Sequence, residues 1–288
     1  MRPWYKYSID ADVRGKKFVG LDEQYHEHAA GMGGYDTDEA YNSKSEFFNN
    51  YFFGYHLGRL QCYDEFIRRH LNKEDKILST ASGRSANELY LMEEGAYNIT
   101  CSDLDMSDEM YRATVNLFPQ FKFYRLNILQ SPAPYTYSAI LNLSMIYLPD
   151  DARLRTFFQH VSQSLESGGK LILDSAGSPD NYLSYLIHDC LLKYEVCLLR
   201  AKKLFTTGKL EGIVIKHHDF RRTDGEIIAM ANEFGLKLQD KSDYAFLVEF
   251  KRSYFLNKII SASRAAENIF TTMGKYIPYI RMFCFYKT

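Results

Sequence analysis

The segment Lys76-Ile77-Leu78-Ser79-Thr80-Ala81-Ser82-Gly83-Arg84-Ser85-Ala86-Asn87-Glu88-Leu89 passes from a short apolar run to small residues and then to a helical pattern that continues to Gly95. A second short run follows and closes on Asp103. This order predicts a strand, a tight loop, a helix and a second strand, which is the first half of a nucleotide-binding α/β unit. Small residues let a ligand approach the loop backbone, and the N-terminus of the helix supplies N–H donors and a positive dipole. Asp103 follows Gly83 by 20 residues, where such folds place a carboxylate that accepts hydrogen bonds from ribose hydroxyls.

The loop Ala81-Ser82-Gly83-Arg84-Ser85 resembles the Gly-x-Gly-x-Gly loop of class I S-adenosylmethionine-dependent methyltransferases. In that family the first strand usually carries an acid where Ser79 stands, and glycines where Ala81 and Ser85 stand. Only the middle glycine is kept here. A left-handed backbone at Ala81 would cost roughly 1 kcal/mol, which a folded protein tolerates.

Further segments follow in the order of that family. The expected strands three to seven are 121–126, 137–143, 170–174, 236–239 and 280–286. In the family the last two strands form a hairpin, the seventh running antiparallel to its neighbours. A Gly168-Gly169 turn precedes the fifth strand, as the resemblance requires.

The expected fold is therefore α/β: a Rossmann-like, mostly parallel seven-stranded sheet with an antiparallel last strand, helices on both faces and a helical cap. Residues 1–71 would form an N-terminal arm and helical cap, and residues 72–288 the methyltransferase domain. Insertions at about 178–223 and 241–279 would lie on the substrate side or form an oligomer contact, which leaves a homodimer open.

The composition of this chain of 288 residues limits the classes of partner that it can be expected to bind. The net charge is −1, with 35 basic and 36 acidic residues, so no overall field draws it to nucleic acid or to an anionic membrane. The sequence contains no run of about 18 uncharged apolar residues, so no membrane-spanning helix is expected. The 5 cysteines include no Cys-x-x-Cys pair, which favours buried thiols in a reducing cytosol over disulfides or zinc. The expected partner is a small molecule, suited by 23 tyrosines that combine an apolar face with a hydroxyl.

The resemblance implies S-adenosyl-L-methionine as cofactor and a set of residues that bind it. Asn127 stands where the family has an acid beside the adenine ring, and its side-chain carbonyl can still accept a hydrogen bond from an exocyclic amine. The set comprises Ser79, Ala81, Ser82, Gly83, Asp103, Leu104, Asn127, Ile128, Leu143 and Ser144.

Transfer of a methyl group to a hydroxyl needs in-line positioning and a base near the carboxyl ends of strands four and five. Tyr147, Asp174, His217 and His218 are the candidates. The histidines rank first because imidazole titrates near neutrality. Adjacent residues of a strand point to opposite faces, so at most one of the two enters the site; surface or packed histidines are the alternative for either.

Two other groups of residues have plainer interpretations. His26-Glu27-His28 lacks a third ligand at a characteristic spacing, so we expect no metal. Arg221-Arg222 and Lys251-Arg252 either meet an anionic substrate or form solvated pairs, the commoner arrangement.

The leading hypothesis is an enzyme that transfers a methyl group from S-adenosylmethionine to a small molecule, most readily to a hydroxyl. The departures at Ser79, Ala81, Ser85 and Asn127 keep a catalytically inactive cofactor-binding protein as an alternative. A nicotinamide-dependent oxidoreductase is the third, against which the spacing of the small residues and the expected antiparallel strand both count.

Overall fold

The computed structural model describes residues 6–9, 43–51, 55–104, 106–143, 145–146, 149–175, 216–220, 222–245 and 278–288, with short pieces at 181, 197, 201, 204–206 and 208. For 6–9, 49–51, 55–58, 61, 216–220, 245 and 278–279 only the backbone is described.

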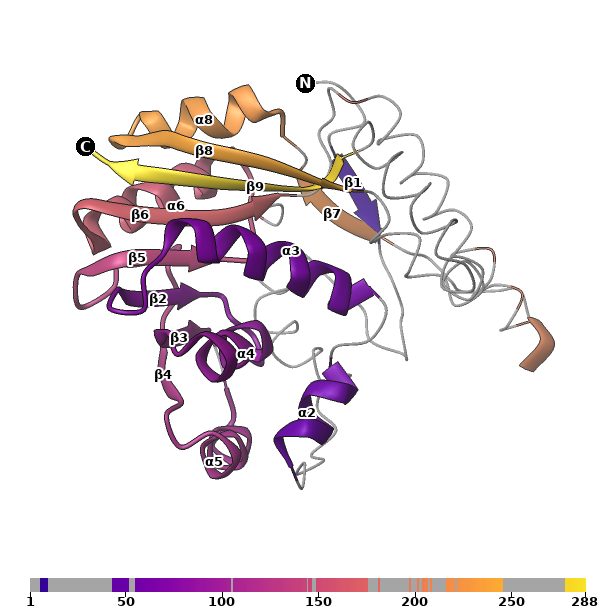
Figure 1. Ribbon diagram of the computed structural model, residues 1–288. Helices are drawn as coiled ribbons and strands as arrows, with labels where there is room; N and C mark the ends of the chain where they lie inside the picture. The colour runs from indigo at the N-terminus through magenta and orange to yellow at the C-terminus, as the bar shows by residue number, and fades with distance from the viewer. Residues whose placement is uncertain are drawn as a thin grey trace, which may run out of the picture.

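A seven-stranded sheet in the order β4-β3-β2-β5-β6-β9-β8 forms the centre of the molecule (Figure 1). Strands β2 to β6 run parallel, and β9 is antiparallel to both of its neighbours, β6 and β8. This topology confirms the predicted fold, including the antiparallel last strand. The strands are β2 (Lys76–Thr80), β3 (Asn98–Asp103), β4 (Lys122–Arg125), β5 (Tyr137–Asn142), β6 (Leu165–Ser175), β8 (Leu236–Ala245) and β9 (Pro278–Lys287).

Helices cover both faces of this sheet (Figure 1). Side chains of α2, α3, α4 and α5 contribute to one apolar cluster, and those of α6 and α8 to another. The bounds are α2 (Lys44–Tyr51), α3 (Tyr55–His70), α4 (Ala86–Gly95), α5 (Asp108–Leu117), α6 (Asp151–Ser164) and α8 (Asp224–Asn232).

The two clusters follow from the alternation of side chains along the strands. Ile77 packs in the first cluster and its neighbour Leu78 in the second; Cys284 and Phe285 of β9 divide in the same way. Successive side chains of a strand point to opposite faces, so continuous apolar runs are expected where both faces are covered.

Two helices begin at residues whose side chains cap the first turn. The Ser107 hydroxyl accepts a hydrogen bond from the Met110 amide at 3.1 Å, and Asp150 caps α6 through the Arg153 amide at 2.9 Å. Each cap satisfies one of the amide donors left free in a first helical turn.

The bounds of three strands differ in detail from the sequence prediction. Strand β8 reaches Ala245 and β9 begins at Pro278, so the segment between them is shorter than expected. Strand β6 already begins at Leu165, with a register irregularity at the Gly168-Gly169 turn. Most of 178–223 and all of 246–277 lie outside the described residues.

A second, two-stranded sheet pairs the N-terminal strand β1 (Lys6–Ile9) with β7 (Lys216–Phe220) in antiparallel fashion. Strand β7 is the extended segment that the sequence predicted around His217 and His218. Its pairing with the N-terminal arm was not expected, because backbone pairing between segments 200 residues apart leaves no mark in local sequence.

Candidate functional site

The candidate site lies at the carboxyl edge of the sheet, between β2 and β5. From β2 the chain proceeds outward to β3 and β4, then returns to place β5 on the other side of β2. Such a reversal of strand order opens a crevice where α/β proteins bind ligands. The loop 81–85, Asp103, Asn127 and Leu143 all follow or end strands at this edge.

The loop 81–85 has a glycine-type backbone despite its sequence. Ala81, Gly83 and Ser85 have φ angles of 54°, 54° and 57°, which is the left-handed region that non-glycine residues rarely adopt. These are the three positions at which the resembling family has glycine. The loop therefore keeps the backbone path of that motif, at a conformational cost of roughly 1 kcal/mol at each of the two substituted positions.

Asp103 and Gly83 lie in direct contact. One oxygen of the Asp103 carboxylate accepts a hydrogen bond from the Gly83 amide at 2.6 Å, and the other accepts one from the Leu104 amide at 2.7 Å. A Cβ built on Gly83 would meet no heavy atom of the described residues within 4 Å. Among the described residues, nothing covers the Gly83 backbone on the side of its missing Cβ, next to a half-buried carboxylate.

Serines tie the rest of the loop to β3. The Ser82 amide bonds to the Ser102 carbonyl at 3.0 Å, and its hydroxyl lies 3.0 Å from that of Ser85. The Ser102 hydroxyl donates to the Ser79 carbonyl at 2.9 Å. These bonds hold the strained loop in place, as residues in rare backbone conformations require.

Asn127 and Ile128 lie just beyond β4. The Asn127 side-chain carbonyl accepts a hydrogen bond from the Leu129 amide at 3.0 Å, which makes it a turn-forming residue; a carbonyl oxygen retains a second lone pair for a ligand. Ile128 is buried, whereas Leu104 beyond β3 is half-buried. The sequence-predicted adenine side thus lies at the expected edge.

At the end of β5, Asn142 bridges the two strands that flank the crevice. Its amide nitrogen donates to the Thr80 hydroxyl at 2.9 Å, while its buried side-chain oxygen has no hydrogen-bond partner among the described residues. Leu143 follows and is buried. Ser144 and Tyr147, which the sequence predicted in this loop, lie outside the described residues.

Of the candidate bases, Asp174 is engaged in a buried ion pair. It ends β6 and accepts hydrogen bonds from the Tyr63 hydroxyl at 2.6 Å and from Arg59 of α3 at 3.0 Å. A carboxylate held in this way ties helix α3 to the end of β6. His217 and His218 are residues of β7, for which only the backbone is described. The side chains of Tyr51, Tyr55 and His56 also lie outside the described residues.

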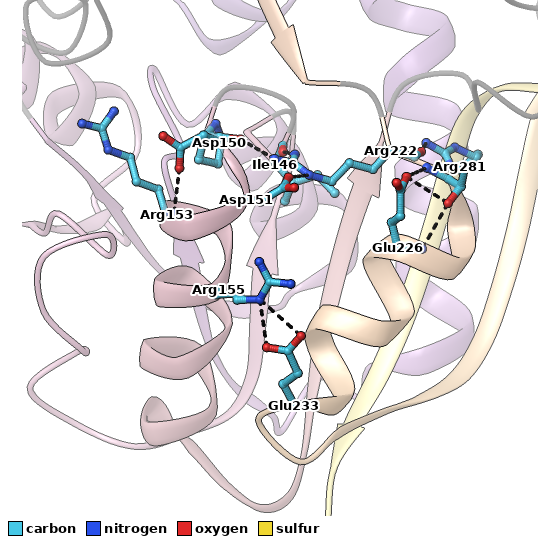
Figure 2. Close-up of polar contacts among 11 residues, drawn as sticks. Ile146, Asp150, Asp151, Arg153, Arg155, Arg222, Glu226, Glu233 and Arg281 are labelled. Carbon is cyan, nitrogen blue, oxygen red and sulfur yellow. Dashed lines mark hydrogen bonds and ion pairs between the residues drawn. The ribbon is translucent and has the colours of Figure 1, made fainter. Parts of the chain in front are cut away.

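Arg222 is neither a substrate contact nor a solvated residue, which corrects the sequence interpretation. It is 4% exposed, and its guanidinium donates to Asp151 at 2.9 Å, the Ile146 carbonyl at 2.9 Å and the Pro149 carbonyl at 2.7 Å (Figure 2). Arg221 and Lys251-Arg252 lie outside the described residues. Arg222 therefore fixes the loop after β5 to the start of α8.

A second buried arginine, Arg281 of β9, continues this cluster. It donates to the Ser175 hydroxyl at 3.0 Å, to the Arg222 carbonyl at 2.8 Å and to the Asp224 carboxylate. Burial opposes ionisation of Asp224, but the hydrogen bond from Lys241 and the charge of Arg281 outweigh it and lower the pKa of the carboxyl. We call Arg222, Arg281, Asp224 and Asp151 the arginine cluster.

Sequence reasoning missed Glu88, a buried acid of α4. Its carboxylate accepts a hydrogen bond from the Ser79 hydroxyl at 2.6 Å. A signal was present: Glu88 precedes the apolar residue Met92 by one helical turn, and residues at i and i+4 share a helix face.

Neither a metal site nor a membrane span is found in the described parts of the chain. No group of three or more His, Cys, Asp or Glu residues there could hold a metal ion. No described helix is both long and apolar enough to cross a bilayer. His26-Glu27-His28 lies outside these residues.

Comparison with known proteins gives matches to solved structures alone, and these identify the fold. No family model matches the sequence, and no curated protein matches it.

Solved structures do match. A magnesium protoporphyrin IX methyltransferase from Synechocystis, solved with S-adenosylhomocysteine, has a TM-score of 0.51 at 11% identity and covers 93% of this chain and 97% of its own. A 1,6-didemethyltoxoflavin-N1-methyltransferase from Burkholderia thailandensis, solved with its substrate and S-adenosylhomocysteine, also has a TM-score of 0.51 at 11% identity, covering 93% and 85%. The PH0226 protein from Pyrococcus horikoshii reaches 0.51 at 12% identity, covering 91% and 99%.

These matches and the strand order lead to one conclusion: the chain has the Rossmann-like fold of the class I S-adenosylmethionine-dependent methyltransferases.

Proposed function

We propose that this protein is an S-adenosylmethionine-dependent methyltransferase that acts on a small-molecule acceptor, most readily a hydroxyl. One observation carries the proposal: the left-handed loop 81–85 leaves Gly83 uncovered by the described residues on the side of its missing Cβ, with the Asp103 carboxylate bonded to the Gly83 amide. Structures of the same fold, from Synechocystis and Burkholderia thailandensis, were solved with S-adenosylhomocysteine.

The residues present fit such a cofactor. The uncovered backbone at Gly83 suits the amino-acid portion of the cofactor. The Asp103 carboxylate suits the ribose, because its oxygens can accept hydrogen bonds from the ribose hydroxyls as they do from backbone amides. Asn127, Ile128 and Leu104 would flank the adenine, with Leu143 and Ser144 on the β5 side. When bound, the cofactor supplies an electrophilic methyl group on a sulfonium.

The remaining chemistry belongs to the chain. It must hold the acceptor in line and take a proton from it as the bond forms. Because Asp174 is paired with Arg59, we assign the proton to one of the two β7 histidines, with Tyr147 as the further candidate.

Calorimetric titration with S-adenosylhomocysteine tests the proposal. We expect binding by the unaltered protein and a loss of about 10- to 100-fold in affinity for Asp103→Asn, because a charge-assisted hydrogen bond contributes about 1.5–3 kcal/mol. The matched control is Asp108→Asn, an acid that is exposed at the start of α5. Absence of binding by the unaltered protein would overturn the proposal.

Turnover is tested separately, by release of S-adenosylhomocysteine in the presence of pools of hydroxylated metabolites. We expect His217→Ala or His218→Ala, but not both, to lower the rate at saturating cofactor. Binding without any methyl transfer would favour the alternative of an inactive cofactor-binding protein. A nicotinamide-dependent oxidoreductase is disfavoured because antiparallel β9 lies between β6 and β8, where the dinucleotide-binding order has none.

A further inference from the structure

The carboxyl group of Glu88 lies beneath the loop 81–85. Glu88 is in the first turn of α4, directly after the loop, and is 2% exposed. One of its oxygens accepts the hydrogen bond from Ser79, at the end of β2. The carboxyl is thus shielded from water and joined to the strand from which the loop departs.

The second oxygen of Glu88 is buried and has no hydrogen-bond partner among the described residues. Such an atom costs about 1–3 kcal/mol, more when charged, and native proteins rarely keep one without a reason. Glu88 and Asn142 are both bonded to the last residues of β2, Ser79 and Thr80, at the carboxyl edge of the sheet where we place the cofactor.

The surroundings of Glu88 disfavour its negative charge. Burial is the largest influence and raises the pKa of Glu88 to about 7; the Ser79 hydroxyl and the backbone amide of Glu88 itself lower it, and the Asp103 charge on β3 raises it. Cys101, also on β3, is the neighbouring thiol: burial first, and the Glu88 charge second, raise its pKa. The basic residue nearest in sequence is Arg84, in the loop itself.

We propose that Glu88 is a positioning residue through which the loop 81–85 distinguishes a cationic ligand from a neutral one, its carboxylate forming when a positive charge is bound above the loop. This inference rests on the proposed function, since the two ligands concerned are S-adenosylmethionine and S-adenosylhomocysteine. They differ in one methyl group and one positive charge on sulfur, so the enzyme would hold its substrate more firmly than its product.

The pH dependence has a definite sign. A nearby cation favours the ionised form of Glu88 and lowers its pKa, so binding of S-adenosylmethionine releases protons near neutral pH. Affinity for the cation therefore rises with pH through this range. Affinity for the neutral thioether changes less, because it contributes no charge at sulfur.

The test is the ratio of the two dissociation constants, product over substrate, measured by calorimetry on the full chain at pH 6, 7 and 8. We expect the ratio to rise by about 2- to 5-fold between pH 6 and 8, which corresponds to a coupling of about half to one pKa unit. Glu88→Gln, which keeps the shape and removes the ionisation, should give a ratio independent of pH. Glu94→Gln is the matched control, because Glu94 lies on the same helix and is exposed.

Proton release by the unaltered protein provides a measurement that needs no variant. Titrations at pH 7 in buffers of different ionisation enthalpy should show protons released with S-adenosylmethionine and fewer with S-adenosylhomocysteine. If both ligands bind with a ratio that does not change with pH, or if Glu88→Gln keeps the pH dependence, the role of Glu88 is refuted and the proposed function stands. If neither ligand binds at any pH, the proposed function fails and this inference with it.

Discussion

Two parts of the same sheet edge treat buried polar groups in opposite ways. Around the loop 81–85, two residues have left-handed backbones that disfavour their side chains, and Glu88 and Asn142 each keep a buried oxygen without a partner among the described residues. In the arginine cluster, Arg222 and Arg281 each contact three acceptors. Glu88, Asn142, Arg222 and Arg281 are all buried, so the exposure of these side chains does not explain the difference.

The contrast indicates where a ligand belongs. A buried cation is tolerated when it is paired with an acid and hydrogen-bonded, and Arg222 and Arg281 are each bonded to a carboxylate and to backbone carbonyls of the chain itself. The loop region retains strain and unmet hydrogen-bonding capacity, which are typical of functional sites. We therefore place the proposed ligand at the loop region and assign the arginine cluster a supporting role.

The largest effect is expected from Arg281→Ala. Removing the guanidinium leaves the Ser175 hydroxyl and the Arg222 carbonyl without their donor, although Asp224 keeps Lys241. We expect the free energy of unfolding to fall by about 3–5 kcal/mol, the range for breaking a buried ion pair. Urea denaturation at pH 7 measures it, and a loss below about 1 kcal/mol would contradict the structural role.

The matched control lies at the other end of α8. Arg155 pairs with Glu233 at 2.9 Å (Figure 2), but each side chain is 44% exposed. Arg155→Ala should change the free energy of unfolding by less than about 0.5 kcal/mol, because exposed ion pairs gain little over solvation by water.

Glu88→Gln should have the next largest effect on stability, and one that depends on pH. The pKa of Glu88 is raised from 4.5 to about 7 in the folded protein, so between these values the folded state binds more protons than the unfolded state. Stability conferred by the protonated group is then lost as pH rises through this window. Relative to the unaltered protein, Glu88→Gln should gain about 2–3 kcal/mol on going from pH 4.5 to pH 8. Equal pH profiles in thermal denaturation would show that Glu88 titrates normally.

Ala81→Gly should produce the smallest change. Glycine removes the cost of a left-handed conformation, roughly 1–2 kcal/mol. It also lowers the free energy of unfolding by about 0.4–1 kcal/mol, because the unfolded chain gains entropy. The expected result is a gain of about 0.5–1 kcal/mol in the free energy of unfolding, seen as a higher melting temperature. Ala96→Gly is the control: Ala96 has φ 55° at the end of α4, outside the loop, and should give a similar gain with no change in ligand affinity. A loss of stability in Ala81→Gly would mean that the loop is not strained.

Much of the sheet was predictable because its strands are continuous apolar runs bounded by small or acidic residues. Leu78 and Ile140 are buried as their runs predict, and Asp103 meets Gly83 because both lie at the ends of neighbouring parallel strands. The prediction for Arg222 was wrong because it too used local sequence alone. A pair of charged residues before a helix is usually solvated, and the local sequence does not show that Arg222 is buried.

Hydrophobic periodicity and the order of the segments predicted the α/β architecture and the edge at which a ligand would bind, because apolar burial follows local patterns. The antiparallel β9 was predicted from the resemblance to the methyltransferase family. The three-dimensional packing was needed to show that Asp174 is tied to Arg59, that Arg222 and Arg281 are buried together, and that Glu88 lies under the loop. These contacts join residues from separate strands and helices. The ionisation of a side chain depends on the burial and the charges that such contacts create, and neither is encoded in the neighbouring residues of the chain.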